Sequence, residues 1–380
     1  MNDWAPEQFP SRRNAVYLNH AGVSPLTAAA RDSLVEYARE ASEYGYAAYP
    51  GWTARGRRCR VLAAQLLNAA SPDDVAFVRG TTHGLQLLAT SIRWRPGDVV
   101  VVEGATFPAN WYGWKSAGRF GAEVWTWPER AYRYDLSELE ARLRRGGVRL
   151  VAVASANYAT GWRQDLAAIG SLCRRHGALL CVDAIQTLGA FPLDVRAIGA
   201  DFLCAGGHKW LLSPEGSGLL YVAPAAIGEL DDALVAWRGR ERFTDYEDHA
   251  LPPRRDARRF EEGALNVDGI LGFGASLELF LDRGIDRIEA TIQGHVDALR
   301  EALIQLGFHV VSPERREERC GIVAAMRGGA DMGRMAEALA REGVVCVARR
   351  GFLRLAPHGY QTDAEISCAI DALRRVSAAW

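Results

Sequence analysis

The stretch AGGHKWLLSPEGSG, from Ala205 to Gly218, places one lysine between a histidine and a tryptophan, with glycines on both sides. A lysine on an ordinary surface has no need of glycines before it or of a Gly-Ser-Gly sequence after it. Glycines at such positions allow another group to approach the backbone closely. The stretch therefore indicates that Lys209 lies in close contact with a bulky ligand.

The segments on either side of this stretch predict a layered fold. ADFLCAGG before Lys209 and GSGLLYVA after it have the continuous apolar character of buried strands, as do DVAFVRG, RPGDVVVVEG, RLVAVASAN and ALLCVDAIQ upstream. Helical patterns, among them THGLQLLATSI and DLAAIGSLCRRHG, lie between them. Because buried strands that alternate with helices form parallel sheets, we predict a three-layer α/β fold with a mostly parallel sheet.

The C-terminal third of the chain has a different pattern. After Glu261, a long helical stretch precedes short strand-like segments that surround the helical segment MGRMAEALAREG. We predict a large domain over residues 1–260, which includes the N-terminal segment, and a smaller α+β domain over residues 261–380. Within the large domain, a helical pattern from about Arg31 to Asn68 is interrupted at Tyr49-Pro50-Gly51.

The composition narrows the possible classes of function. The 380 residues carry a net charge of −1, which argues against nucleic acid or an anionic membrane as a partner. Seven scattered cysteines without a CxxC pair argue against a disulfide framework and a metal cluster. The N-terminal sequence MNDWAPEQFPSRRN has no apolar signal region, and no apolar run reaches membrane-spanning length. We therefore expect a cytoplasmic protein without a bound metal and with a small-molecule ligand.

Reactive residues are predicted at the carboxyl ends of strands, where ligands bind in sheets of this kind. Asp183 closes an apolar strand, and a carboxylate is costly to bury there without a cationic or N–H partner. A lysine with a lowered pKa forms Schiff bases readily. Pyridoxal phosphate requires both groups, a lysine for its aldehyde and an acid for its pyridinium nitrogen. Asp183 and Lys209 together therefore favour this cofactor in the large domain.

The same cofactor needs a phosphate cradle and an aromatic face. In RGTTHGLQ, the hydroxyls of Thr81 and Thr82 open a helix whose N–H groups and dipole favour an anion, and TFPAN offers Phe107 after a strand. Each residue alone also fits a structural explanation. Lys209 fits a solvated surface lysine, Asp183 a cap at a strand end and the two threonines a helix cap. Their shared place at strand ends favours the cofactor site.

The combination of VDAIQ, GGHKW and RRFEEGALN resembles the class V aminotransferase family, whose members include cysteine desulfurases, kynureninases and isopenicillin N epimerase-like proteins. The resemblance extends from YLNHAGVSPL, which begins at Tyr17, to RLAPHGYQT, which ends at Thr362. It implies the aspartate-aminotransferase-like (type I) fold of pyridoxal 5'-phosphate enzymes. It also implies a homodimer in which the segment Glu262–Asn266 lies near the partner subunit's active site.

The resemblance implies a role for each residue of the cofactor site. Lys209 would form the internal aldimine and, as the catalytic residue, later move the proton at the substrate's Cα. Asp183 would pair with the pyridinium nitrogen, and Phe107 would stack on the ring, as a phenylalanine does in the kynureninase branch. The remaining cofactor-binding residues would contact the ring's phenolic oxygen (Asn157 and Gln186) or the phosphate (Thr81, Thr82 and His208).

A substrate site is implied as well. Arg354 matches the arginine that binds the substrate carboxylate through two parallel hydrogen bonds. His20, Ala21 and Gly22 match an N-terminal loop that borders the substrate. The substrate would therefore be an amino acid held by its carboxylate.

Three positions depart from the family pattern. Gly206 stands where the family often has a serine, and Ala264 stands where it often has a threonine that reaches the neighbouring subunit's phosphate. Two phosphate-binding hydroxyls are thus missing, so the cradle must differ or bind the cofactor less tightly. His83 stands where a glutamate is usual, and it is either an acid–base group near the ring or a helix-end histidine that faces solvent.

The reaction stays open between several outcomes. Cys346 lies within a strand-like apolar run rather than on a loop, so we predict a core cysteine and not the nucleophile of a desulfurase. We expect transamination of an amino acid; the alternatives are a Cβ–S lyase or desulfurase-like enzyme, a kynureninase-like enzyme and an epimerase. Lys209, Asp183 and Arg354 argue against a catalytically silent binding protein of the same fold. The absence of GxGxxG and GxxxxGK[ST] motifs argues against a nucleotide-dependent enzyme.

Overall fold

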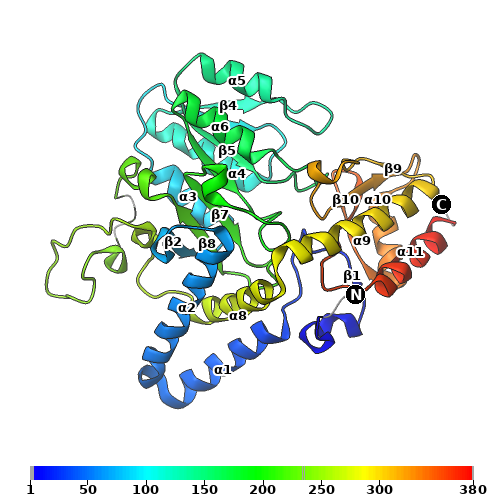
Figure 1. Cartoon of the computed structure of the whole chain (residues 1–380), viewed down its shortest axis with the longest axis horizontal. Coiled ribbons are helices and arrows are strands. Elements are labelled where there is room, and N and C mark those ends of the chain that lie inside the picture. Colours follow the sequence, from blue (N-terminus) through cyan, green and yellow to red (C-terminus); the bar gives the residue numbers. More distant parts are fainter. Residues whose placement is uncertain (1–3, 233, 235, 379–380) are drawn as a thin grey trace.

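Strands β2 to β8 form the central sheet of the computed structural model, which describes residues 4–232, 234 and 236–378 (Figure 1). Their order across the sheet is β2-β8-β7-β6-β5-β3-β4. β8 runs antiparallel to β2 and β7, and the other neighbouring pairs are parallel. The mostly parallel sheet predicted from the apolar runs is confirmed. The strands span Val75–Val78 (β2), Val99–Glu103 (β3), Glu123–Trp127 (β4), Val148–Ala154 (β5), Leu179–Asp183 (β6), Phe202–Gly206 (β7) and Gly218–Val222 (β8).

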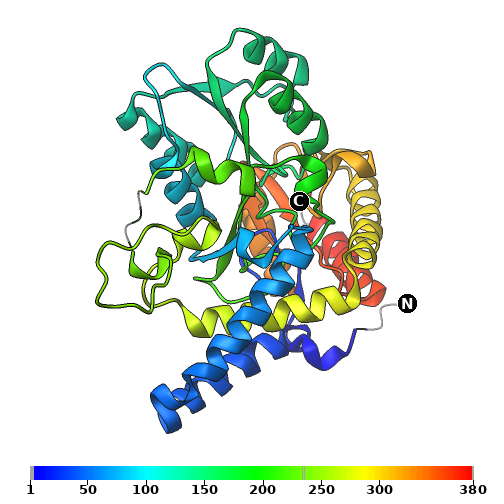
Figure 2. The ribbon, with the colours of Figure 1, turned by 60° about the vertical axis from the view of Figure 1, so that its left-hand side comes forward.

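Helices cover both faces of this sheet (Figures 1 and 2). They span Ala28–Tyr44 (α1), Tyr49–Leu67 (α2), Thr81–Ser91 (α3), Pro108–Lys115 (α4), Leu136–Arg144 (α5), Leu166–His176 (α6), Val195–Ile198 (α7) and Val267–Arg283 (α8). In β3, Val101 packs into the core on the side of α2, α5, α6 and α8, whereas Val100 and Val102 pack on the side of α3 and α4. Runs of valine suit such strands because β-branched side chains pack well on both faces of a pleated sheet. The fold is therefore three layers deep, as predicted.

The helical region near the N-terminus is broken at Gly45–Ala48, a short 3-10 helix, and not at Tyr49-Pro50-Gly51 as predicted. α2 begins at Tyr49, with Pro50 in its first turn. Proline is compatible with that turn because the N–H it lacks would have no partner within the helix. The residues interpreted as a break are therefore a helix start. Both views show α1 and α2 projecting below the sheet, and α8 packs against both (Figures 1 and 2).

The C-terminal part of the chain has its own antiparallel sheet, with the order β12-β13-β10-β9. The long helical stretch predicted before it is two helices, α8 and α9 (Ile285–Gln305), separated at Gly284, where φ is +85°. Glycine adopts this conformation without the strain that a side chain would cause. The remaining elements span His309–Val310 (β9), Val323–Met326 (β10), Met332–Arg341 (α10), Val344–Val345 (β11), Val347–Arg349 (β12), Phe352–Leu355 (β13) and Asp363–Ser377 (α11).

The N-terminal segment packs against this C-terminal part. β1 (Val16–Tyr17) pairs in parallel with β11, and Trp4 and Phe9 share a hydrophobic core with α9 and α11. Residue 261, where we predict a domain boundary, follows a short 3-10 helix (Ala257–Phe260) and precedes α8. The division of the chain at this position stays a prediction.

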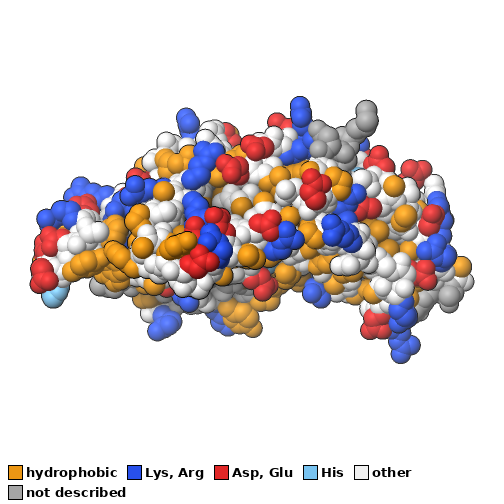
Figure 3. Space-filling view, turned by 90° about the horizontal axis from the view of Figure 1, so that it is seen from below, with side chains coloured by type: hydrophobic (Ala, Val, Ile, Leu, Met, Phe, Trp, Pro, Cys, Tyr) orange, Lys and Arg blue, Asp and Glu red, His pale blue; other side chains and the backbone are white. Residues whose placement is uncertain are grey.

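Charged side chains of both signs are mixed over the surface. On the face seen in Figure 3, basic and acidic side chains lie beside one another, with hydrophobic side chains between them. Ion pairs such as Arg39–Glu43 on α1 and Arg58–Glu278 between α2 and α8 join some of these charges. Over residues 4–232, 234 and 236–378, no helix is long and apolar enough to cross a membrane. Within the same residues, no three His, Cys, Asp or Glu side chains gather as a metal site would require.

Candidate active site

The carboxyl-terminal edge of the central sheet borders a cavity of about 650 Å³. Its walls come from segments far apart in the sequence: the N-terminal loop, the starts of α3 and α4, the ends of β6 and β7, and the hairpin β12–β13. Parallel strands end on the same side of a sheet, which is why the residues that follow them meet here. The predicted site residues that line this cavity are Ala21, Gly22, Thr81, Thr82, Phe107, Asp183, Gln186, His208, Lys209 and Arg354.

Lys209 follows β7, and its Nζ lies 5.6 Å from the centroid of the Phe107 ring. Burial lowers the pKa of Lys209 to about 8; the carboxylate of Asp183 opposes this change, whereas the charges of Arg354 and Arg349 add to it. A lysine with a lowered pKa has more of the neutral amine that attacks an aldehyde. Only two of the 45 Lys and Arg residues of the chain are lysines. Arginine, which dominates this set, does not lose its proton in proteins and cannot take the same role.

Asp183 closes β6 and is 3% exposed. Its carboxylate accepts hydrogen bonds from Nδ2 of Asn110 (2.7 Å) and from the N–H of Ile185 (3.1 Å). Burial raises the pKa of Asp183, and the hydrogen bonds and the charge of Lys209 oppose this rise. A cationic ring nitrogen beside this carboxylate would offset its burial further. Sequence reasoning missed Asn110, although it lies in the same FPAN motif as Phe107, three residues later on the first turn of α4.

The start of α3 offers unpaired N–H groups to an anion. Gly80 precedes the helix with a φ of +149°, and the exposed Thr82 lines the cavity. The hydroxyl of Thr81 accepts a hydrogen bond from the N–H of Gly206 (3.0 Å), which joins α3 to the end of β7. A Cβ at Gly206 would lie only 3.0 Å from the ring of His208. A side chain at position 206 would therefore require the His208 ring to shift by a few tenths of an ångström.

His83 belongs to a polar cluster at the rim of the cavity. Its Nδ1 accepts a hydrogen bond from the N–H of Arg79 (3.2 Å), and its Nε2 lies 3.4 Å from the carboxylate of Glu262, which pairs with Arg79 at 2.8 Å. Burial and the charge of Arg79 lower the pKa of His83, which favours the neutral ring. His83 also lines a neighbouring cavity with Ala264 and Asn266. The segment Glu262–Asn266 thus lies beside α3 of its own chain, and its approach to a partner subunit stays a prediction.

Gln186 and Asn157 use part of their hydrogen-bonding capacity within the protein. Nε2 of Gln186 donates to the carbonyl of Ala21 (3.2 Å), and its Oε1 accepts from the indole N–H of Trp210 (3.1 Å). Oδ1 of Asn157 accepts from the N–H groups two and three residues later (2.9 and 3.1 Å). Asn157 lines a narrow cavity that also borders Lys209. Each side-chain amide carries two N–H donors, so each residue keeps a donor for a phenolic oxygen. The contacts themselves stay a prediction.

Arg354 is a buried guanidinium group whose partners are neutral. It lies in β13, is 2% exposed, and donates to the carbonyl of Tyr158 (2.7 Å) and to Oδ1 of Asn19 (3.1 Å). Among the described residues, no carboxylate forms an ion pair with it, and its Nε is buried without a hydrogen-bond partner. Burial and the charge of Arg349 lower the pKa of Arg354 to about 10. Because a buried cation without a counter-charge is costly, an anion in the cavity would stabilise it.

The hairpin β12–β13 brings two arginines to the cavity. Arg349 pairs with Phe352, so only Arg350 and Gly351 connect the two strands. Both have positive φ (51° and 81°), as in a type I' turn. Arg349 lines the same cavity as Arg354. Sequence reasoning missed Arg349 because its place depends on the register of this hairpin.

Cys346 lies in the core, as predicted. It is 8% exposed, it packs in the hydrophobic core of the C-terminal part, and burial raises the pKa of its thiol to about 12. The other cysteines are buried too, except Cys368, which is exposed on α11. All seven cysteines belong to the described residues, and none of them lines the cofactor-sized cavity.

The structure does not bring the side chain of His20 to the cavity, in contrast to the prediction. The ring is fully buried, with Nδ1 2.7 Å from the carbonyl oxygen of Ala356 and Nε2 3.0 Å from the hydroxyl of Tyr360. Burial holds the pKa of His20 well below its usual range. Ala21 and Gly22 do line the cavity. His20 therefore ties the N-terminal loop to the C-terminal part of the chain.

The cavity residues fit pyridoxal 5'-phosphate. One cavity joins a lysine amine, a buried carboxylate, an aromatic ring and a helix start that favours an anion. These are the groups that the cofactor needs for its aldehyde, its ring nitrogen, its ring face and its phosphate. The guanidinium group of Arg354, which has no carboxylate partner among the described residues, lines the same cavity, and its contact with a substrate carboxylate stays a prediction.

Known proteins resemble this chain over most of its length. Residues 16–352 match the family described as Aminotransferase class-V. A probable cysteine desulfurase from Methanothermobacter thermautotrophicus is 32% identical over 286 residues, which cover 74% of this chain and 70% of the relative. An uncharacterized aminotransferase from Bacillus subtilis, YcbU, is 30% identical over 320 residues, which cover 81% of this chain and 80% of the relative.

Solved structures share the predicted fold and its smaller C-terminal domain. An apo cysteine desulfurase from Thermococcus onnurineus has a TM-score of 0.89 at 20% identity, over 99% of this chain and 98% of that one. A form of the cystine C–S lyase C-DES with glycine covalently linked to its PLP cofactor has a TM-score of 0.87 at 24% identity, over 98% of this chain and 99% of that one. This chain belongs to the class V aminotransferase family, and its cofactor is pyridoxal 5'-phosphate.

Proposed function

We propose that the protein is a Cβ–S lyase, which cleaves the bond between Cβ and sulfur of an amino acid and releases the sulfur product into solvent. The cysteine desulfurases among its relatives support a sulfur-containing amino acid as the substrate. The likeness to a cystine C–S lyase supports the fold but not by itself the reaction. Transamination, which we expected from the sequence, is the second candidate, because a relative is described as an uncharacterized aminotransferase.

The observation that carries the proposal is the tight hairpin before Arg354. An enzyme that transfers sulfur to its own cysteine needs a thiol that reaches the substrate's sulfur. In this chain, two residues connect β12 and β13, and Cys346 is buried with the pKa of its thiol raised to about 12. No cysteine of the described residues lines the cavity. The sulfur group then leaves with the electron pair of its bond to Cβ rather than moving to the protein.

The residues of the cavity have separate roles in the reaction. Bound pyridoxal 5'-phosphate withdraws electrons from the Cα of an attached amino acid. We assign the substrate's carboxylate to Arg354, the proton leaving Cα to the amine of Lys209, and the charge on the ring nitrogen to Asp183. Loss of that proton and of the sulfur group leaves an unsaturated amino acid, which water converts to pyruvate and ammonia.

Product analysis separates this reaction from its alternatives. The PLP-loaded protein is incubated with cystine or S-ethylcysteine, and pyruvate, alanine and the sulfur product are quantified. We expect equal amounts of pyruvate and sulfur product, without any need for an oxo acid. We also expect unchanged turnover in Cys346→Ala, because that thiol is buried in the core. Alanine as the product, or conversion only when an oxo acid is added, would contradict the proposal and support desulfuration or transamination, respectively.

A further inference from the structure

One buried acid beside the cofactor cavity takes no part in the reaction proposed for this protein. Glu103 is the last residue of β3, and it is 4% exposed. It lines a narrow cavity together with Asp183, Asn157 and Lys209. Glu103 and Asp183 close two strands of the same parallel sheet, β3 and β6, which lie on either side of β5. A second buried carboxyl group therefore lies near the one to which we assign the ring nitrogen.

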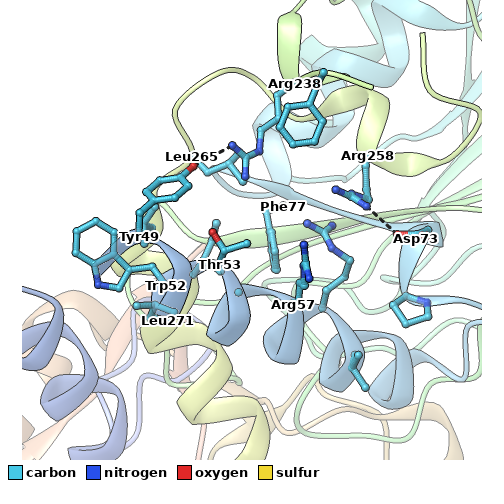
Figure 4. Close-up of a pocket in the computed structure, with 17 residues that line it drawn as sticks. Tyr49, Trp52, Thr53, Arg57, Asp73, Phe77, Arg238, Arg258, Leu265 and Leu271 are labelled. Atoms are coloured by element: carbon cyan, nitrogen blue, oxygen red, sulfur yellow. Dashed lines mark hydrogen bonds and ion pairs between the residues drawn. The ribbon is translucent and has the colours of Figure 1, made fainter. Parts of the chain in front are cut away.

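Among the described residues, two glutamates are buried, and their surroundings differ in charge. Glu261 pairs with Arg60 at 2.7 Å. Arg60 lines the cavity shown in Figure 4, where Arg258 forms another ion pair with Asp73 (3.2 Å). Glu103, in contrast, forms no ion pair with a described residue. Because a buried carboxylate without a cation is costly, the surroundings of Glu103 favour its protonated form.

The hydrogen-bond partners of Glu103 suit either charge state. Its Oε2 accepts a hydrogen bond from the N–H of Ala154 (2.9 Å), and its Oε1 accepts one from Nε2 of Gln164. A side-chain amide carries both donors and an acceptor. Gln164 can therefore turn its oxygen toward a protonated carboxyl group and its nitrogen toward a carboxylate. Ala154 ends β5 and Gln164 lies just before α6, so the two bonds also hold both ends of the segment that carries Asn157.

The charged and titratable groups around Glu103 come from several other segments of the chain. They are Asp183 of β6, Lys209 after β7, Tyr134 after β4, and the ion pair of Glu129 with Arg350 near Tyr134. Burial raises the pKa of Glu103 to about 7, its hydrogen bonds oppose this rise, and the charge of Asp183 adds to it. Burial raises the pKa of Asp183 as well. Since like charges disfavour each other, the two carboxyl groups do not both ionise readily.

We propose that Glu103 is protonated in the apo protein and ionises when the cationic ring of the cofactor binds, so that it acts through Asp183 as a positioning residue. The charge of the ring nitrogen offsets that of Asp183, which removes the repulsion that keeps the proton on Glu103. Gln164 also lines a cavity of about 720 Å³, which gives the proton a route to solvent. Ionised Glu103 then adds negative charge behind Asp183 and keeps the ring nitrogen protonated.

This inference rests on the assignment of the ring nitrogen to Asp183 and is independent of the bond that the enzyme cleaves. Infrared difference spectroscopy of the native protein tests it, because a protonated carboxyl group has its own C=O stretching band. Apo and PLP-loaded protein are compared at pH 6, with and without carbon-13-labelled glutamate. We expect a carboxyl band in the apo protein that shifts with the label, is lost when PLP binds and is missing in Glu103→Gln.

Asp201→Asn is the matched control for this spectrum. Burial raises the pKa of Asp201 too, and its carboxylate accepts a hydrogen bond from the N–H of Leu180 (2.7 Å). Asp201 precedes β7, however, and so lies at the opposite edge of the sheet from the cofactor cavity. This variant should keep the band that PLP removes.

The pH dependence of PLP affinity gives a second measure. Below about pH 6.5, the loss of one more proton on binding should make the dissociation constant for PLP fall by an additional factor of about ten per pH unit in the native protein, compared with Glu103→Gln. Lys209 and the groups of the cofactor titrate in both proteins, so the difference isolates Glu103.

Three results would overturn the proposal: no glutamate band in the apo protein that PLP removes, a PLP-sensitive band that remains in Glu103→Gln, or the same pH dependence of PLP affinity in both proteins. The labelled band is measured on the native protein, so it decides the question even if Glu103→Gln folds poorly.

Discussion

Two buried charges face the cofactor cavity, one from the central sheet and one from the C-terminal sheet, and the protein satisfies them differently. The carboxylate of Asp183 accepts two hydrogen bonds and has Lys209 as a nearby cation. The guanidinium group of Arg354 donates to neutral oxygens and has no carboxylate partner among the described residues. The Asp183 side thus has its partners within the protein, whereas the Arg354 side lacks a counter-charge among the described residues. We interpret this difference as the division between a resident cofactor and an incoming substrate.

The largest effect is expected on the Asp183 side, from Lys209→Ala. The variant loses the amine to which we assign the cofactor aldehyde and the Cα proton, so kcat/KM should fall by about 10²- to 10⁴-fold. The release of pyruvate measures this loss. Lys115→Ala is the matched control, because Lys115 is the other lysine of the chain and is exposed at the end of α4. Full activity in Lys209→Ala would show that the reaction does not require this amine.

On the Arg354 side, Arg354→Met should act on the substrate and spare the cofactor. A lost charge-assisted interaction costs about 1.5–3 kcal/mol, so KM should rise by roughly tenfold to a hundredfold. The melting temperature should stay equal or rise, because the variant removes a buried charge that lacks a counter-charge. Steady-state kinetics and thermal unfolding measure the two effects. Weaker cofactor binding at an unchanged KM would contradict the assignment of Arg354 to the substrate.

The lowered pKa of Lys209 predicts how cofactor capture by the apo protein depends on pH. Only the neutral amine attacks the aldehyde, so the capture rate should rise about tenfold per pH unit below pH 8 and level off above it. Stopped-flow absorbance records this rate. In Asp183→Asn the plateau should begin at a lower pH, because the carboxylate raises the pKa of Lys209. A rate that still increases tenfold between pH 9 and pH 10 would show that the lysine is not perturbed.

A smaller effect is expected from Asn110→Ala, which removes one hydrogen bond to Asp183. The net value of such a bond is about 1.5 kcal/mol, so PLP should bind roughly tenfold more weakly, with the KM of the substrate nearly unchanged. Equilibrium titration with PLP measures the affinity. Tyr112→Ala, a change at a 69% exposed residue of the same helix, serves as the control. An equal effect of both variants would mean that α4 is disturbed as a whole.

The two sides also differ in how well the sequence predicts them. Asp183 and Lys209 each follow an apolar strand, and the parallel sheet alone is enough to bring such residues to one edge. Arg349 reaches the cavity through the register of β12 and β13, which residue patterns do not determine. The His20 ring lies in the core because its hydrogen-bond partners are Ala356 and Tyr360, which are more than 300 residues away in the sequence. No local sequence motif indicates such a contact.

The most direct test of the cofactor assignment is to reduce the PLP-loaded protein with borohydride and to locate the pyridoxyl group by peptide mass spectrometry. The chain holds two lysines, so the result is a choice between Lys209 and Lys115. We predict modification of Lys209 alone, and its loss when an amino-acid substrate is added before the reductant. Modification of Lys115 instead, or of neither lysine, would contradict the site built around Lys209 and Asp183.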